Sequence, residues 1–132
     1  MNIKNLLVLK KYVLLISIGY TVSLLALSLL TLDFDKIEDL VPSFSDKIFH
    51  FGAYALLTLV WFYTLTVHFN FTKIKALLIV TSASIAFGTI IEVLQKELTN
   101  TRTFDWYDVT ANMGGVVIAA SIVLFYKKSD VK

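Results

Sequence analysis

Four stretches of about 20 mostly apolar residues follow one another along this chain of 132 residues. Their approximate ranges are 12–32, 48–68, 76–96 and 106–126. A helix of about 20 apolar residues is long enough to cross the hydrocarbon core of a bilayer. Because the connections between the stretches are short, they leave no room for a separate soluble domain. We therefore predict an all-α polytopic membrane protein, a single domain over residues 1–132 with four transmembrane helices in a compact bundle.

The composition excludes several other classes of protein. Hydrophobic residues make up 57% of the chain and charged residues 17%, whereas soluble domains are about 45–50% apolar and about 25% charged. A small soluble domain buries only about two thirds of its surface, which is too little to cover so many apolar side chains. The absence of cysteine excludes a disulfide-stapled scaffold. The first stretch is too long for a signal peptide and lacks a small-residue cleavage site, so we expect an uncleaved helix.

Lysine and arginine are distributed unevenly between the two ends of the predicted helices. Eight of the 12 lie on the side that carries both chain termini, at Lys4, Lys10, Lys11, Lys73, Lys75, Lys127, Lys128 and Lys132. The remaining four are Lys36, Lys47, Lys96 and Arg102. Cytoplasmic loops of membrane proteins carry an excess of these cations. The distribution therefore predicts that both termini are cytoplasmic.

The unusual polar residues gather at the opposite, outer ends of three predicted helices. They are Asp46, His50, Tyr54, Glu92, Gln95, Arg102, Asp105, Asp108 and Asn112. Charged groups in a membrane span are costly, so they normally face protein or water and have partners. We predict that these residues form one outward-facing, ligand-binding pocket.

Helical spacing places these residues on common faces. On the second predicted helix the aspartate, the histidine and the tyrosine are each four residues apart, and residues so spaced are neighbours on a helix. Asp105, Asp108 and Asn112 share one face of the fourth helix at positions i, i+3 and i+7. The three helices can therefore present their polar faces to one another.

Glu92 has the most apolar sequence surroundings of the set, which indicates a position inside the bundle. It shares a helix face with Ser84 and Gly88. We expect its partner to be Arg102, His50 or both, because a carboxylate at this depth requires one.

Small residues recur every fourth position along the fourth helix, at Ala111, Gly115 and Ala119. Such ladders allow transmembrane helices to approach closely. We expect this face to touch a neighbouring helix below the polar residues.

Simpler structural roles are open for individual residues. Asp46 and Asp108 each occupy a position from which a side chain can cap a helix N-terminus. His50 and Glu92 can be held by purely structural hydrogen bonds. Trp61 and the aromatic residues beside it are expected in the belt at the membrane interface.

Three sequence pieces together resemble the VanZ-like family of small bacterial integral membrane proteins. They are DKIFHFGAY at 46–54, EVLQ at 92–95, and RTFDWYD at 102–108 with Asn112 and Gly115. The pieces occur in the family's order, and the resemblance spans about residues 46–125. It implies a multi-pass protein of the bacterial inner (cytoplasmic) membrane and a role in the cell envelope. It also implies a link to antibiotic resistance, since the family's namesake is associated with resistance to the glycopeptide teicoplanin.

The first functional hypothesis is that the pocket binds an envelope lipid or its headgroup. Arg102 would pair with a phosphate or carboxylate, while Tyr54, Gln95 and Trp106 would contact sugar or peptide groups. The expected partners are membrane lipids, with a lipid-linked envelope precursor or a glycopeptide as more specific candidates. We expect no nucleic acid partner, and the sequence identifies no cofactor.

The alternative hypothesis is a small membrane-embedded enzyme that acts on lipid-linked envelope material. The catalytic candidates are His50, Glu92 and Asp105, with the imidazole as acid or base and a carboxylate as its partner. A set of Asp46, His50, Asp105 and Asp108 could hold a divalent metal instead, although no metal ligand is assigned. A structural scaffold or small channel is the hypothesis with least support.

Overall fold

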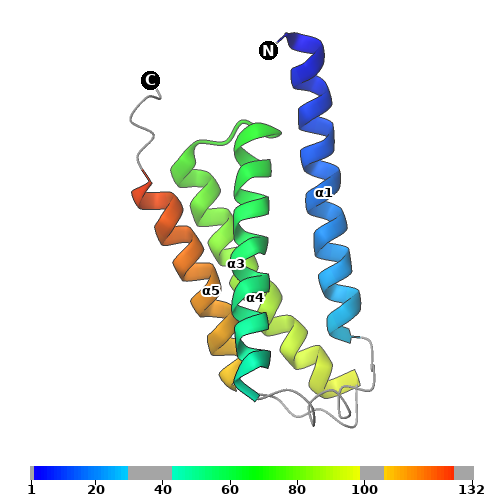
Figure 1. Ribbon diagram of the computed structural model, residues 1–132, viewed down its shortest axis with the longest axis vertical. Helices are drawn as coiled ribbons and strands as arrows, with labels where there is room; N and C mark the ends of the chain where they lie inside the picture. The colour runs from blue at the N-terminus through cyan, green and yellow to red at the C-terminus, as the bar shows by residue number, and fades with distance from the viewer. Residues whose placement is uncertain (1, 30–42, 99–105, 127–132) are drawn as a thin grey trace.

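The computed structural model describes residues 2–29, 43–98 and 106–126, and within these ranges it consists of four helices (Figure 1). They are α1 (Ile3–Leu29), α3 (Ser43–Val67), α4 (Lys73–Leu98) and α5 (Trp106–Phe125). The described ranges contain no strand. The side chains of residues 43–46, 95 and 98 also lie outside the description.

Each of the four helices is long and apolar enough to cross a membrane, by length and composition. The predicted all-α membrane bundle is therefore confirmed. Three of the helices begin before their apolar windows, most clearly α1, which begins at Ile3 instead of near residue 12. The apolar window ends at Lys10 and Lys11, but the helix continues through both residues. Lysine is a good helix former, and its side chain can extend its charge towards water.

The helices run alternately up and down (Figure 1). The start of α1, the end of α5 and the turn between α3 and α4 lie at one end of the bundle, and the start of α3, the end of α4 and the start of α5 lie at the other. In the α3–α4 turn Asn70 adopts a positive φ of 60°, a conformation that asparagine tolerates better than most residues. Thr72 then caps α4 by accepting a hydrogen bond from the Lys75 backbone nitrogen at 3.3 Å.

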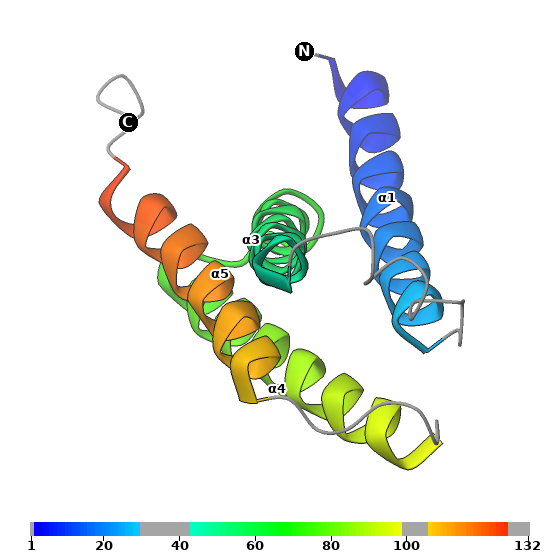
Figure 2. The same ribbon diagram turned by 60° about the horizontal axis from the view of Figure 1, so that its bottom comes forward.

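Helix α3 lies at the centre of the bundle and contacts all three other helices, most extensively α5 (Figure 2). The small-residue ladder explains the closeness of α5. A Cβ atom on Gly115 would collide with the backbone carbonyl oxygen of Phe51 and lie 3.0 Å from the backbone nitrogen of Ala55. Ala119, one turn further along α5, is also buried. The expectation that this face touches a neighbouring helix is confirmed.

Helix α1 is joined to α3 through hydroxyl and indole hydrogen bonds. The hydroxyls of Ser17 and Thr64 bond to each other, and the Tyr20 hydroxyl donates to the Ala53 carbonyl at 2.6 Å. The indole of Trp61 donates to the Thr21 hydroxyl, also at 2.6 Å. The position of Trp61 in the interfacial belt stays a prediction, and its indole N–H is used between helices.

Candidate functional site

The structure describes the side chains of five residues of the predicted pocket. They are His50, Tyr54, Glu92, Asp108 and Asn112. Arg102 and Asp105 lie outside the described residues, as do the side chains of Asp46 and Gln95. The described five come from α3, α4 and α5, and all lie towards the end of the bundle opposite the α3–α4 turn.

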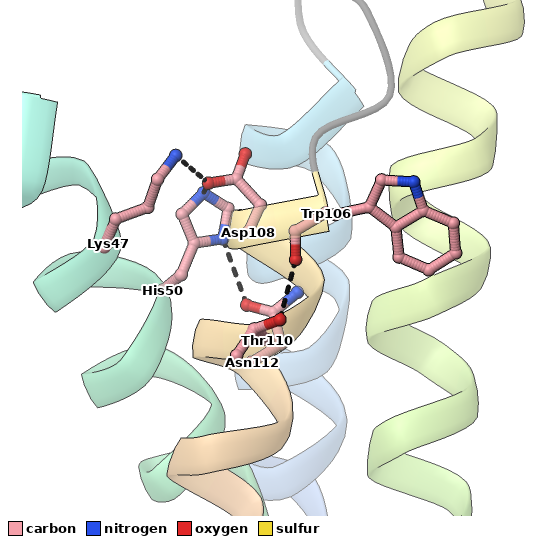
Figure 3. Close-up of polar contacts among 6 residues, drawn as sticks. All are labelled: Lys47, His50, Trp106, Asp108, Thr110 and Asn112. Atoms are coloured by element: carbon pink, nitrogen blue, oxygen red, sulfur yellow. Dashed lines mark hydrogen bonds and ion pairs between the residues drawn. The ribbon is translucent and has the colours of Figure 1, made fainter.

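Two pairs of residues, each spanning one helical turn, face each other across the α3–α5 contact (Figure 3). Nζ of Lys47 lies 2.5 Å from Oδ1 of Asp108 and forms an ion pair with it. Nδ1 of His50 lies 3.1 Å from Oδ1 of Asn112. Lys47 and His50 are three residues apart on α3, and their partners on α5 are four residues apart. Each spacing is about one helical turn, so both contacts form at the same relative position of the two helices.

The contact with Asn112 determines which nitrogen of His50 carries the hydrogen in the neutral ring. An amide oxygen only accepts hydrogen bonds, so Nδ1–H of His50 donates to it. The other ring nitrogen, Nε2, then presents its lone pair and lies 3.7 Å from Oδ1 of Asp108. The imidazole is thus oriented with a basic nitrogen directed at a carboxylate.

Glu92, on α4, adds a second carboxylate beside His50 and Asp108. Donor atoms of Glu92, His50 and Asp108 all lie within 4.8 Å of one another. The close approach of α4 depends on Gly88, one turn earlier. A Cβ atom there would lie 2.9 Å from the ring of Tyr54 and 3.1 Å from Nδ2 of Asn112. The prediction that Glu92 and Gly88 share an inward face is confirmed.

We call Lys47, His50, Glu92, Asp108 and Asn112 the polar cluster. Its two carboxylates are almost fully buried, with Glu92 2% and Asp108 3% exposed. Buried charges are stable only when they are paired or coordinated. The side chain of Lys47 is 30% exposed, against 4% for that of Asp108. The ammonium therefore lies at the rim of the polar cluster and the carboxylates lie inside it.

Sequence reasoning missed Lys47, which it treated as one of the outer cations. Its spacing of three residues from His50 was the available indication that both lie on the same face of α3. Trp106 was expected to contact sugar or peptide groups of the ligand. Its ring extends away from His50 and is exposed (Figure 3).

A separate groove of about 340 Å³ runs between α1, α3 and α4. Most of its lining is apolar and includes Leu57, Trp61 and Phe87. Leu57 is seven residues from His50, which corresponds to about 10 Å along a helix. The groove and the polar cluster therefore lie at successive depths of the same two helices, α3 and α4.

Comparisons of the chain with protein-family models, with curated proteins and with solved structures find no match.

Proposed function

We propose that this chain is a VanZ-like protein of the bacterial cytoplasmic membrane that binds the headgroup of an envelope lipid at the polar cluster. The observation that carries the proposal is the convergence of buried polar side chains from three membrane helices at one depth. Ionisable residues inside a membrane bundle are expensive and commonly mark a binding or transport site.

The chemistry of the polar cluster suits a headgroup that carries both an anion and hydrogen-bond donors. The Lys47 ammonium at the rim can pair with a phosphate or a carboxylate. The carboxylates of Glu92 and Asp108 can accept hydrogen bonds from sugar hydroxyls, amines or peptide amides. The neighbouring groove has the apolar lining that an acyl chain needs. Arg102, outside the described residues, is proposed as a second anion partner.

The orientation with both termini in the cytoplasm places the polar cluster at the outer leaflet. The uneven distribution of lysine and arginine supports this orientation. At that position the protein would meet membrane lipids, lipid-linked envelope precursors and glycopeptides. Through binding of such a ligand, we propose, the protein contributes to teicoplanin resistance.

Native mass spectrometry of the detergent-purified protein tests headgroup binding. The probes are phosphatidylglycerol and a lipid-linked cell-wall precursor. We expect Lys47→Gln to weaken retention of the preferred lipid by about 10-fold or more, the size expected for one charge-assisted hydrogen bond. Lys75→Gln makes the same charge change at the other end of the bundle and serves as the control. Equal retention by both variants and the wild type would contradict the proposal.

The geometry of His50 favours a second candidate function, a membrane-embedded enzyme. Its Nε2 faces Asp108 at 3.7 Å while Asn112 holds Nδ1, which suits a general acid or base. Two carboxylates lie near the imidazole: Glu92, a catalytic candidate predicted from sequence, and Asp108, which is absent from those candidates. Incubation with the lipid-linked precursor distinguishes the two functions. Product formed by the wild type and lost in His50→Gln supports the enzyme, and retention without turnover supports the binding protein.

A further inference from the structure

We propose that the polar cluster holds a divalent transition-metal ion, zinc or manganese, between Nε2 of His50 and the carboxylates of Glu92 and Asp108. The three donors come from three different helices, and their atoms lie within 4.8 Å of one another. This inference goes beyond headgroup binding and does not depend on it, because the site is formed by the protein alone.

The distances between donors are close to those of a metal site. Donors about 2.1 Å from one ion lie roughly 3.0–4.2 Å apart, depending on the geometry. Nε2 of His50 and Oδ1 of Asp108 are already 3.7 Å apart. No two of the donor atoms are more than 4.8 Å apart, so an ion would have to draw only the widest pair closer together.

The donor types select the class of ion. One imidazole nitrogen with two carboxylates suits zinc or manganese. Calcium and magnesium prefer sites made entirely of oxygen atoms, and an imidazole nitrogen is a poor ligand for either. A transition-metal ion therefore fits these three residues better than either alkaline-earth ion does.

The contact between His50 and Asn112 fits a metal-binding role for the histidine. Histidines that bind a metal usually donate their other ring N–H to an oxygen that fixes the orientation of the ring. Asn112 Oδ1 does this for Nδ1 at 3.1 Å, and Asn112 is itself buried. Nε2 is consequently held towards the Asp108 carboxylate, before any ion arrives.

Lys47 competes with the ion for Asp108. Its Nζ lies 2.5 Å from the same Oδ1 that faces His50 (Figure 3). The ammonium therefore occupies part of the space in which a metal cation would lie. Because its side chain is partly exposed, it can move towards water when a divalent ion binds. Removal of Lys47 should then strengthen metal binding, although it should weaken binding of an anionic headgroup.

The test is a titration of the lipid-depleted, chelator-treated protein with Zn²⁺ and Mn²⁺ alone, in competition with a metal-sensitive dye. We expect one ion per chain. Binding should become at least 10-fold weaker in His50→Gln, Glu92→Gln and Asp108→Asn, and 10- to 100-fold weaker in Asn112→Ala, the usual range for a residue that orients a ligand. His68→Gln, which changes the histidine at the other end of the bundle, should bind as the wild type does.

Lys47→Met keeps every proposed ligand, so it tests the site without removing a donor. It should bind Zn²⁺ at least 5-fold more tightly than the wild type. Absence of stoichiometric binding, unchanged binding in the three ligand variants, or weaker binding in Lys47→Met would each overturn the metal site. Failure of the wild type to retain lipid, or equal retention by Lys47→Gln, with metal binding intact would overturn only headgroup binding, so the two failures are distinguishable.

Discussion

Gly115 of α5 lies directly against the backbone carbonyl of Phe51 in α3, with no space for a side chain between the two helices. This contact lies one turn below Asn112, so it sets the separation of the helices where the polar cluster forms. Any change that moves the helices apart here will also lengthen the contacts of His50 and Lys47 with α5.

Replacement of Gly115 by alanine should therefore destabilise the protein. The added Cβ collides with the Phe51 carbonyl, and overpacking of this kind typically costs about 1–3 kcal/mol. Gly52→Ala is the matched control on the facing helix, because a Cβ atom there has nothing within 4 Å. Thermal unfolding in detergent should show a lower midpoint for Gly115→Ala and an equal or higher midpoint for Gly52→Ala. Equal midpoints for the two variants would contradict the proposed close contact.

Lys47→Met should lower stability in metal-free buffer, because it removes the ammonium beside the buried Asp108 carboxylate. Loss of one partner of a fully buried pair costs about 3–5 kcal/mol, and the partial exposure of Lys47 reduces this to about 1–3 kcal/mol. Lys47→Arg should retain most of the stability, while Lys75→Met controls for charge removal elsewhere. Addition of Zn²⁺ should restore the midpoint of Lys47→Met. A midpoint equal to that of the wild type in metal-free buffer would show that the ion pair contributes nothing.

The expected pairing of Glu92 with Arg102 stays a prediction, since Arg102 lies outside the described residues. A double-mutant cycle with Glu92→Gln and Arg102→Gln measures it through thermal stability. Residues in contact usually show coupling energies of about 0.5–3 kcal/mol. We expect each single change to be harmful and the double change to be less harmful than their sum. Additive effects would show that Glu92 relies on the other members of the polar cluster.

The orientation of the chain can be tested by labelling in intact cells, because the protein contains no cysteine. Ser43→Cys and Thr99→Cys should react with a membrane-impermeant maleimide, since both lie at the predicted outer end. Asn70→Cys, in the α3–α4 turn, should react only after the cells are opened. The reverse pattern would move the polar cluster to the cytoplasmic side and would exclude binding at the outer leaflet.

The fold and much of the site were predictable because hydropathy and helical spacing depend only on residues that are close together in the sequence. Four apolar stretches predicted four helices, and the spacing of Asp108 with Asn112 predicted a shared inward face. The same reasoning gave the inward face of Glu92 and Gly88. In each case the position of a residue on its own helix was sufficient.

The contacts that sequence missed depend on the relative rotation and depth of two helices. Lys47 reaches Asp108 only because α3 and α5 meet in one particular register. Trp61 bonds to Thr21 only because α1 approaches that side of α3. Nδ1 of His68 lies 2.9 Å from the backbone carbonyl oxygen of Lys10 only because α1 approaches that end of α3. Spacing within one helix carries no information about these distances.

The hydrogen bonds between α1 and α3 have a consequence for how α1 is oriented about its own axis. Its membrane-spanning part carries no charged residue and no pronounced polar side, so hydropathy alone does not determine which side faces the bundle. Ser17, Tyr20 and Thr21 lie within about one helical turn and all bond to α3. Interhelical hydrogen bonds in membranes average only about 0.6 kcal/mol each, but they are directional. These three weak hydrogen bonds together thus fix the rotation of α1 about its own axis, which contact with lipid leaves undetermined.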